Sequence, residues 1–177
     1  SRGMTPENSA LYTNSTLALN PNNGEIKWFY QHIPGETIDM EVGFERVLID
    51  HKSKKYLFTI GKDGILWKLN RENGDFVKLL ETVDQNIYKN INYKTGKLSY
   101  RNDILNSKIN EAFSVCPGIY GGHNWQAISY DEINRSLIIP LHQLCADMIG
   151  RKVERIEGSG GFGADSKSYA LPSANGK

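Results

Sequence analysis

The chain lacks any apolar run approaching the ~20 residues needed to cross a bilayer, and no segment has the periodicity of an amphipathic helix. Its charges nearly cancel, with 21 Lys and Arg against 20 Asp and Glu, so charge gives no argument for nucleic acid or an acidic membrane as partner. Residues 1–6 show no apolar core of a secretory signal peptide. These absences favour a strand-rich globular domain that binds no nucleic acid.

Cysteine is also scarce. Cys116 and Cys145 are the two cysteines, and neither belongs to a Cys-x-x-Cys pair. They could form a disulfide that closes a loop of about 30 residues and adds roughly 3–4 kcal/mol in an oxidising compartment. They could equally be two free buried thiols, and the spacing alone leaves both alternatives open.

One turn sequence recurs along the chain. Residues 19–24 read LNPNNG, residues 69–74 read LNRENG, and residues 91–96 read the looser INYKTG. Each copy ends in a glycine that can take positive φ in a tight turn between hydrophobic runs. Repetition of such a turn indicates a β-sheet module used more than once, as in a propeller.

The alternation of apolar and polar residues predicts an all-β fold, a partial β-propeller of roughly three four-stranded antiparallel blades. Residues 46–80 read as four strands joined by short turns, which is one blade. Further blade-like units are expected at about 11–45 and 112–150. Residues 81–111 read as loop with one short hairpin, and the Gly- and Ser-rich residues 158–177 are expected to be flexible.

Two polar groups lie in positions that suit chemistry. Asp39 and Glu41 are two residues apart, so in extended backbone they face the same way. Paired carboxylates suit a hard cation or a general base, although a solvated acidic loop is the plainer alternative. Lys62 lies at the tip of a predicted hairpin, where most lysines simply face solvent.

Residues 121–125 read GGHNW. Paired glycines allow a close backbone approach, while Asn124 offers hydrogen bonds and Trp125 a stacking face. The alternative is a tight turn that leads into a strand. His123 has no second histidine nearby, so we do not expect it to bind a metal.

Three segments carry a resemblance to a known family. Residues 18–28 resemble the tryptophan-docking motif of quinoprotein (PQQ-dependent) alcohol dehydrogenases, and residues 28–34 (WFYQHIP) resemble that family's Trp/Phe-x-Tyr-Gln-x-x-Pro. Residues 116–125 (CPGIYGGHNW) resemble its Cys-Pro-x-x-x-Gly-x-x-Asn-Trp. The match runs from about residue 11 to residue 147. It implies an internal piece of the family's larger, eight-bladed ring.

The resemblance also implies roles for single residues. Asp39 matches the aspartate that accepts the substrate hydroxyl proton, and Lys62 matches the cation that contacts the quinone. Asn124, with Trp125 beside it, matches the asparagine that contacts PQQ. Asp39 and Glu41 would bind the metal, and Cys116 would pair with Cys145 as in relatives.

Departures from the family pattern leave some points open. Ile38 stands where many relatives have tryptophan. Glu41 stands where some relatives have an aspartate associated with lanthanide use, so Ca²⁺ and a lanthanide are both possible. The family's other metal ligands, a Glu and an Asn, would precede the residues of this chain.

The implied function is PQQ-dependent oxidation of a primary or related alcohol to an aldehyde or ketone. A cytochrome c or quinone would accept the electrons, the remaining blades would come from other sequence, and the compartment would be the periplasm. This chain alone would be inactive. The alternative is a non-catalytic PQQ-like propeller scaffold for protein–protein interaction, which would have no reason to keep Asp39, Lys62 and Asn124 at family spacing.

Overall fold

The computed structural model describes residues 9–153, 157–158 and 163–171. Within that part the chain is almost entirely antiparallel β-structure, which confirms the predicted fold class. The one described helix has five residues, and no described helix is long and apolar enough to cross a membrane. The elements are β1 (Ser15–Leu19), β2 (Ile26–Gln31), β3 (Val47–His51), β4 (Lys54–Ile60), β5 (Ile65–Asn70), β6 (Phe76–Glu81), β7 (Tyr88–Ile91), β8 (Leu98–Tyr100), α1 (Asn102–Asn106), β9 (Ala112–Val115), β10 (Ser129–Asp131), β11 (Ser136–Ile138), β12 (Leu144–Gly150) and β13 (Ala164–Ala170).

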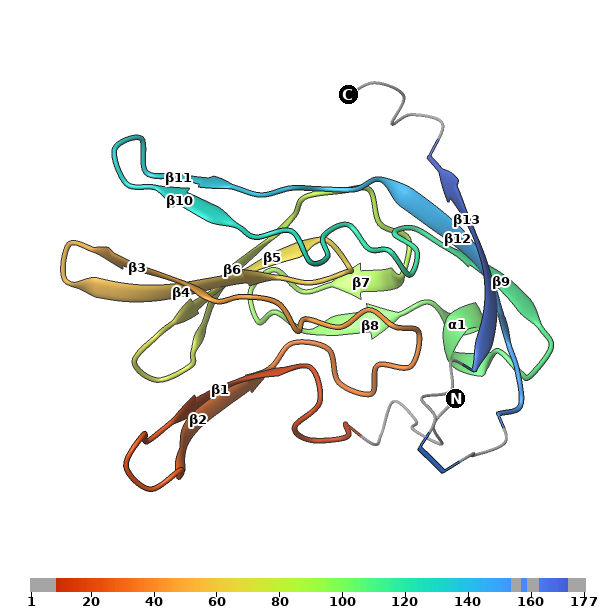
Figure 1. The fold of residues 1–177 in the computed structure, drawn as a ribbon, viewed down its shortest axis with the longest axis horizontal. Helices are drawn as coiled ribbons and strands as arrows, with labels where there is room; N and C mark the ends of the chain where they lie inside the picture. Colours follow the sequence, from red (N-terminus) through yellow and green to blue (C-terminus); the bar gives the residue numbers. More distant parts are fainter. Residues whose placement is uncertain (1–8, 154–156, 159–162, 172–177) are drawn as a thin grey trace.

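The predicted unit at residues 46–80 is a four-stranded sheet of consecutive strands, β3-β4-β5-β6 (Figure 1). One of its two inner strands, β5, alternates strictly between buried and partly buried positions. Ile65, Trp67 and Leu69 are fully buried on one face, because successive side chains of a strand point to opposite faces. The apolar periodicity read from the sequence therefore places this sheet correctly.

The three copies of the turn sequence fold alike. The glycine N–H donates to the carbonyl of the asparagine four residues earlier in each copy, at 2.8, 2.9 and 2.8 Å. Gly24, Gly74 and Gly96 have φ of 74°, 77° and 73°, a conformation that glycine adopts without steric cost. The repeat is thus a repeated turn, as predicted.

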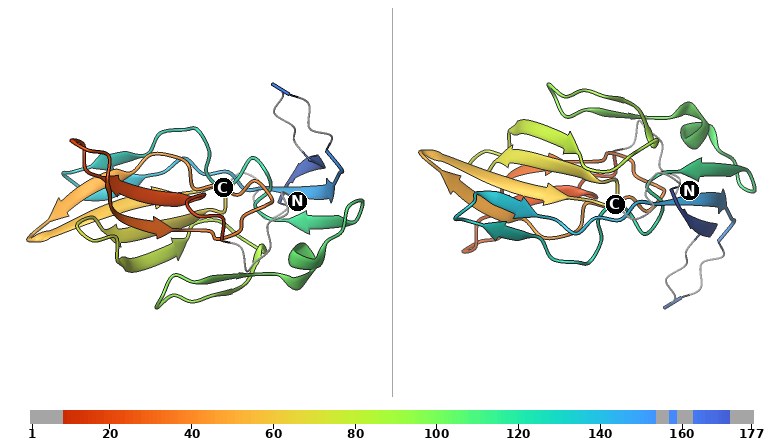
Figure 2. Two further views of the ribbon diagram at one scale, coloured as in Figure 1. Left: turned by 90° about the horizontal axis from the view of Figure 1, so that it is seen from below. Right: turned by 90° about the horizontal axis from the view of Figure 1, so that it is seen from above.

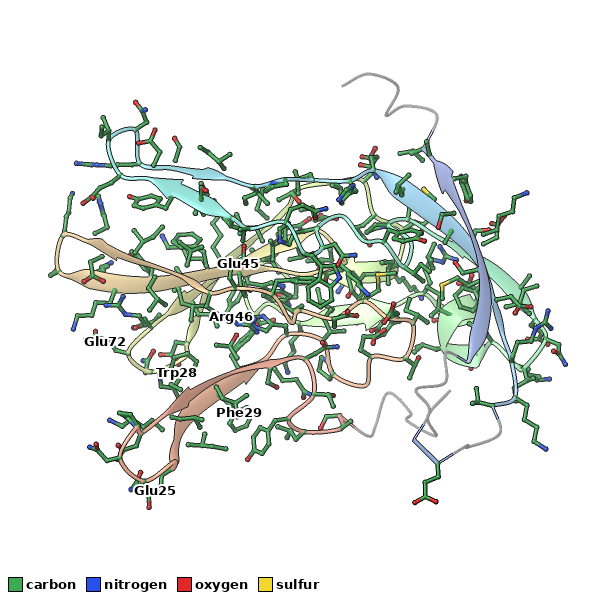
Figure 3. The ribbon with its side chains drawn as sticks, viewed as in Figure 1. Glu25, Trp28, Phe29, Glu45, Arg46 and Glu72 are labelled. Atoms are coloured by element: carbon green, nitrogen blue, oxygen red, sulfur yellow. A yellow bond between two sulfur atoms is a disulfide. The ribbon has the colours of Figure 1, made fainter. Side chains whose placement is uncertain are left out.

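Two of these glycines also receive an aromatic side chain from elsewhere. A β-carbon on Gly74 would lie 2.5 Å from Cε3 of Trp28, which extends from β2 (Figure 3). A β-carbon on Gly96 would lie 2.7 Å from Cδ2 of Phe76. Rings packed on bare glycine turns hold neighbouring sheets together, which gives the repeated glycine a packing role.

The other predicted units differ from four-stranded blades. Residues 11–45 contribute the two-stranded sheet β1-β2, followed by a long loop. Residues 112–150 divide between the hairpin β10-β11 and the sheet β13-β12-β9, which lies beside α1 at the far end of the molecule (Figures 1 and 2). Residues 81–111 are mostly irregular and hold the predicted hairpin, β7-β8, together with the short helix α1.

The expectation of a flexible segment over 158–177 is wrong for residues 164–170. These residues form β13, which pairs with β12 at seven positions from Leu144↔Ala170 to Gly150↔Ala164. The strand is polar and lies at a sheet edge, so it needs backbone pairing but little apolar burial. The prediction relied on composition and missed it; residues 159–162 and 172–177 lie outside the described part.

Candidate functional site

The loop that follows β2 alternates like a strand although it is not paired in a sheet. Ile38, Met40 and Val42 are buried in the main core. The intervening Asp39 and Glu41 therefore face the other way, and each side chain is 39% exposed. Asp39 reaches this arrangement with φ of 70°, a left-handed conformation that aspartate tolerates better than most residues.

Lys62 reaches both carboxylates from the turn between β4 and β5. Its Nζ donates to Asp39 Oδ2 at 2.9 Å and lies 2.8 Å from Glu41 Oε1, while its own side chain is only 9% exposed. Its backbone N–H donates to the Glu41 carbonyl at 3.1 Å. Gly61 permits this approach, because a β-carbon there would lie 2.9 Å from that carbonyl oxygen. The carboxylate pair and the lysine, which the sequence analysis considered separately, thus form one charged cluster.

The electrostatics of the cluster keep Lys62 charged. Burial lowers the pKa of Lys62, but the hydrogen bonds to Glu41 and Asp39 and their negative charges outweigh it, so the pKa lies above its ordinary value. An ammonium shared by two carboxylates leaves one net negative charge in the group. Such a group attracts a further cation.

Residues 118–125 pack directly against the lysine turn. The Gly122 N–H donates to the Lys62 carbonyl at 2.6 Å. A β-carbon on Gly121 would lie 2.7 Å from Lys62 Cα, and one on Gly122 would lie 2.9 Å from Gly64 Cα. The paired glycines therefore serve the close backbone approach that the sequence suggested, and the partner is the turn that carries Lys62.

Asn124 and Trp125 follow this contact and differ in exposure. Asn124 Nδ2 donates to the Tyr120 carbonyl at 3.1 Å, whereas its Oδ1 is buried without a hydrogen-bond partner. Trp125 is 87% exposed and meets the Phe44 ring edge to face at 6.2 Å. An unsatisfied amide oxygen and an open indole face are groups that a planar polar ligand would satisfy.

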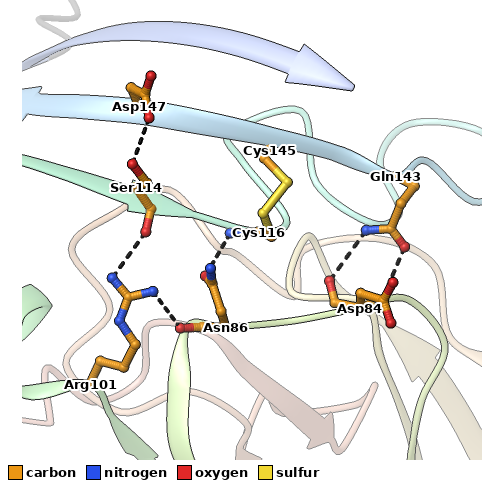
Figure 4. The surroundings of a disulfide bond; sticks show 8 residues. All are labelled: Asp84, Asn86, Arg101, Ser114, Cys116, Gln143, Cys145 and Asp147. Carbon is orange, nitrogen blue, oxygen red and sulfur yellow. Dashed lines mark hydrogen bonds between the residues drawn. A yellow bond between two sulfur atoms is a disulfide. The ribbon is translucent and has the colours of Figure 1, made fainter. Parts of the chain in front are cut away.

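The predicted disulfide between Cys116 and Cys145 is present, and it fixes residues 116–125 to β12. Figure 4 shows the hydrogen bonds around it. The Cys116 N–H donates to Asn86 Oδ1 at 2.8 Å. Arg101 donates to the carbonyls of Asn86 and Ser114 at 2.8 and 3.0 Å. The disulfide therefore lies within a hydrogen-bond network, and the same network links β9 to the segment before β7.

Two adjacent residues, Glu45 and Arg46, tie the acidic loop to other parts of the chain (Figure 3). Arg46 donates to Thr16 Oγ1 of β1 at 3.1 Å and to the Val42 carbonyl at 2.8 Å. Glu45 accepts the Ile128 N–H just before β10. The loop that carries Asp39 is thus bonded both to β1 and to the segment just before β10.

Sequence reasoning missed two acidic residues beneath the cluster. Glu36 accepts the Ile38 N–H, and burial raises the pKa of its carboxyl. Asp63 is 0% exposed; its Oδ1 accepts the Ile65 N–H at 3.1 Å and its Oδ2 accepts the Tyr88 hydroxyl at 3.1 Å. An Asp before Gly is a routine turn signal, so nothing in the sequence marked Asp63 as buried.

Asp63 should make stability depend on pH. Burial raises its pKa to about 7, above the unfolded value of about 3.9. Folding thus favours the protonated form, and its stabilising contribution, complete below the unfolded pKa, is lost as pH rises through about 7. We expect this group to cost the 177-residue chain about 2 kcal/mol of unfolding free energy between pH 5 and pH 7. Asp63→Asn should remove that component in urea titrations at the two pH values.

The control for this measurement is Asp50→Asn. Asp50 is exposed on the β3–β4 hairpin and paired with Arg71, so its removal should leave the pH dependence intact. An Asp63→Asn variant that keeps the full wild-type loss between pH 5 and pH 7 would contradict the assignment.

The donors fit part of a metal site. Asp39 and Glu41 offer hard oxygen ligands on one side of a loop, and a cationic group already lies between them. Within the described residues no group of three or more His, Cys, Asp or Glu could hold a metal ion. Because Ca²⁺ takes about 6–8 oxygen ligands, the missing ligands would have to come from outside this part of the chain.

Comparisons with known proteins agree with this picture. Residues 2–89 match the family model described as the PQQ glucose/ethanol/alcohol dehydrogenase β-propeller domain. The quinoprotein ethanol dehydrogenase of Pseudomonas aeruginosa is 28% identical over an alignment of 175 positions, which covers 92% of this chain and 28% of that protein. The chain therefore spans just over a quarter of that relative's length.

Solved structures share the fold. The europium-containing methanol dehydrogenase superposes with a TM-score of 0.83 at 21% identity, over 90% of this chain and 28% of its own. The quinohemoprotein alcohol dehydrogenase from Comamonas testosteroni gives a TM-score of 0.76 at 26% identity, over 86% and 23%. In both cases this chain covers about a quarter of the larger solved chain.

Proposed function

Because the chain belongs to the family of PQQ-type glucose, ethanol and alcohol dehydrogenase β-propellers, we propose that it forms part of a PQQ-dependent alcohol dehydrogenase. The substrate would be a primary or related alcohol and the product an aldehyde or ketone. The observation that supports this proposal most is the ion-paired cluster of Asp39, Glu41 and Lys62. The two carboxylates come from the loop after β2, and the lysine comes from the turn between β4 and β5.

Each of these residues has a role that its surroundings suit. Bound PQQ would supply the hydride acceptor, and a bound cation would supply Lewis acidity. Asp39, partly exposed and held by Lys62, would accept the alcohol proton. The ammonium of Lys62 would stabilise negative charge that develops beside it. Asn124 would hold the cofactor by hydrogen bonding, and Trp125 offers a free ring face.

Asp39 and Glu41 would contribute carboxylate oxygens to the cation. Ca²⁺ and a lanthanide both prefer such ligands, and one relative of the same fold is europium-containing. Further ligands would come from residues outside this chain. We therefore propose a shared metal site rather than a complete one.

The remaining blades would cover β1-β2. Trp28 and Phe76 cover Gly74 and Gly96, whereas Gly24 has nothing within 4 Å of its β-carbon position. Leu17, Leu19, Ile26 and Phe29 are exposed on the same hairpin. An open glycine turn beside exposed apolar side chains fits an adjoining sheet with its own docking aromatic. Alone, the chain is proposed to be inactive.

We also propose a compartment and an electron acceptor, each on a separate ground. A disulfide between buried cysteines suits an oxidising compartment, such as the periplasm. A cytochrome c or a quinone would accept the electrons, since one relative of the same fold is a quinohemoprotein.

A chimera would test the proposed function. This chain would replace the matching segment of the Pseudomonas aeruginosa quinoprotein ethanol dehydrogenase, and alcohol-dependent dye reduction would be measured with PQQ and Ca²⁺ or La³⁺. We expect turnover that requires both the cofactor and a cation. A folded chimera that binds PQQ but oxidises no alcohol would instead support the non-catalytic scaffold.

A further inference from the structure

We propose that the free edge of β1 accepts a further antiparallel β-strand, with apolar side chains at alternate positions, supplied by the rest of the proposed ring. Among the described residues β1 pairs only with β2. The inference deepens the proposed function, because it states which edge of this chain the remaining sequence joins and with what chemistry. It does not depend on catalysis, so its test needs no cofactor or substrate.

An internal repeat shows what belongs at this edge. β5 begins at residue 65 and β1 at residue 15, and the same offset of 50 residues separates β6 from β2. The ladder β1-β2 is interrupted between Ala18 and Leu19, and the ladder β5-β6 is interrupted at the positions that the same offset gives. The other edge of β5 is filled by β4. The free edge of β1 therefore corresponds to an edge that takes a strand.

The sequence of this chain does not supply a counterpart of β4. At the same offset, residues 4–10 read MTPENSA where residues 54–60 read KKYLFTI. The first stretch has none of the aromatic, Val or Ile residues that favour strands, and Pro6 has no N–H to donate to a ladder. We therefore assign the strand to sequence that this chain does not contain.

The backbone of β1 is directed for such pairing. On the β2 side, the His32 N–H donates to the Asn14 carbonyl at 2.9 Å. Successive residues of an antiparallel ladder direct their polar groups to opposite edges, so those of Ser15 and Leu17 point away from β2. The bond from Arg46 Nη2 to the Ser15 carbonyl at 3.4 Å agrees with this direction. Unpaired groups of this kind are a template for another strand.

A groove of about 650 Å³ lies along this edge. Residues 15–18 of β1 line it together with Leu48 of β3 and Leu57 of β4. Leu48 is 55% exposed. A strand that continues the β1-β2 sheet would lay every second side chain toward these leucines, because side chains alternate between the two faces of a sheet. The groove therefore favours apolar residues at alternate positions of the incoming strand.

The test is titration of the 177-residue chain with a fluorescein-labelled peptide that copies residues 54–61 (KKYLFTIG), the strand at the equivalent edge. We expect saturable binding. Amide hydrogen exchange at Leu17 should slow at least about tenfold at saturation, because its N–H then has a partner. Exchange at Thr16, whose N–H faces β2, should change less than about twofold. A Thr59→Pro version of the peptide lacks an N–H that faces β5 in the equivalent pair, and it should bind at least about tenfold more weakly.

Leu48→Asn tests the groove, and Leu80→Asn is its matched control. Both leucines are 55% exposed, so both variants should stay folded, but Leu48 lines the groove and Leu80, on β6, does not. A docked strand would cover the amide at position 48 with apolar side chains, which is unfavourable. Leu48→Asn should therefore weaken peptide binding about tenfold, and Leu80→Asn less than about twofold.

The chimera with the Pseudomonas aeruginosa enzyme tests the source of the strand. There the rest of the ring is present, so the Leu17 amide should be as protected without peptide as it is in the peptide-saturated chain. If Leu17 exchange in the chain alone slows instead as its own concentration is raised, the edge pairs with a second copy and the assignment to the ring is wrong.

Other results would also overturn the inference. Absence of binding at about 1 mM peptide, or binding that leaves Leu17 exchange unchanged, means that the edge takes no strand. Equal weakening by Leu48→Asn and Leu80→Asn places the peptide elsewhere. The proposed function is judged separately: a chimera that protects Leu17 but oxidises no alcohol refutes catalysis and leaves the strand docking intact, whereas an active chimera with an unprotected Leu17 refutes only the docking.

Discussion

Asp39→Asn should lower kcat by at least about a thousandfold in a protein completed by the rest of the ring, while PQQ stays bound. The carboxamide keeps the size of the side chain but cannot accept the alcohol proton at neutral pH. The Lys62 hydrogen bond at 2.9 Å can persist to the amide oxygen, so the loop should keep its shape. Steady-state dye reduction measures kcat, and the absorbance of bound PQQ measures cofactor retention.

Glu41→Gln separates the base from the metal ligand. Both carboxylates touch Lys62, and both would bind the cation, but only Asp39 is proposed to take a proton. Activity lost in Glu41→Gln should return with excess Ca²⁺ or La³⁺, whereas activity lost in Asp39→Asn should not. If Asp39→Asn retains more than about a tenth of wild-type kcat, another group is the base.

Local sequence patterns explain why the positions of Asp39, Glu41 and Lys62 could be predicted. The turn glycines, the Asp-Gly hairpin and the alternation through residues 38–42 each act over a few residues. The apolar side chains at 38, 40 and 42 are buried, and the intervening Asp39 and Glu41 are partly exposed. Lys62 reaches these carboxylates because the turn that follows β4 lies against the loop, with the Lys62 N–H donating to the Glu41 carbonyl.

The parts that escaped prediction depend on contacts distant in sequence. β9 and β13 pair with opposite edges of β12, and neither strand has a strong apolar alternation of its own. Asp63 is buried because Tyr88, 25 residues later, covers it. A pairing partner or a covering ring at such separation leaves no mark on the local pattern.

The resemblance to family motifs gave information about residues that are far apart in the sequence. It implied that Asn124 and Lys62 would contact the same cofactor and that Cys116 would pair with Cys145, a pairing that spacing alone left open. The disulfide is formed, and the Gly122–Lys62 hydrogen bond brings residues 121–125 to the lysine turn. The contact of Asn124 and Trp125 with a cofactor stays a prediction.

The Cys116→Ser, Cys145→Ser double variant should lose about 3–4 kcal/mol of unfolding free energy, because the bond closes a loop of about 30 residues in the unfolded chain. Both cysteines are buried, and the bond lies at the start of the segment that reaches Lys62. Urea titration measures the loss. Hydrogen exchange at the Gly122 amide should also quicken, since that N–H donates to Lys62.

Reductant should destabilise wild type by a similar amount and leave the double variant unchanged. A loss below about 1 kcal/mol would mean that the folded chain does not rely on this bond, and residues 116–125 would then be held against the lysine turn by the glycine contacts alone.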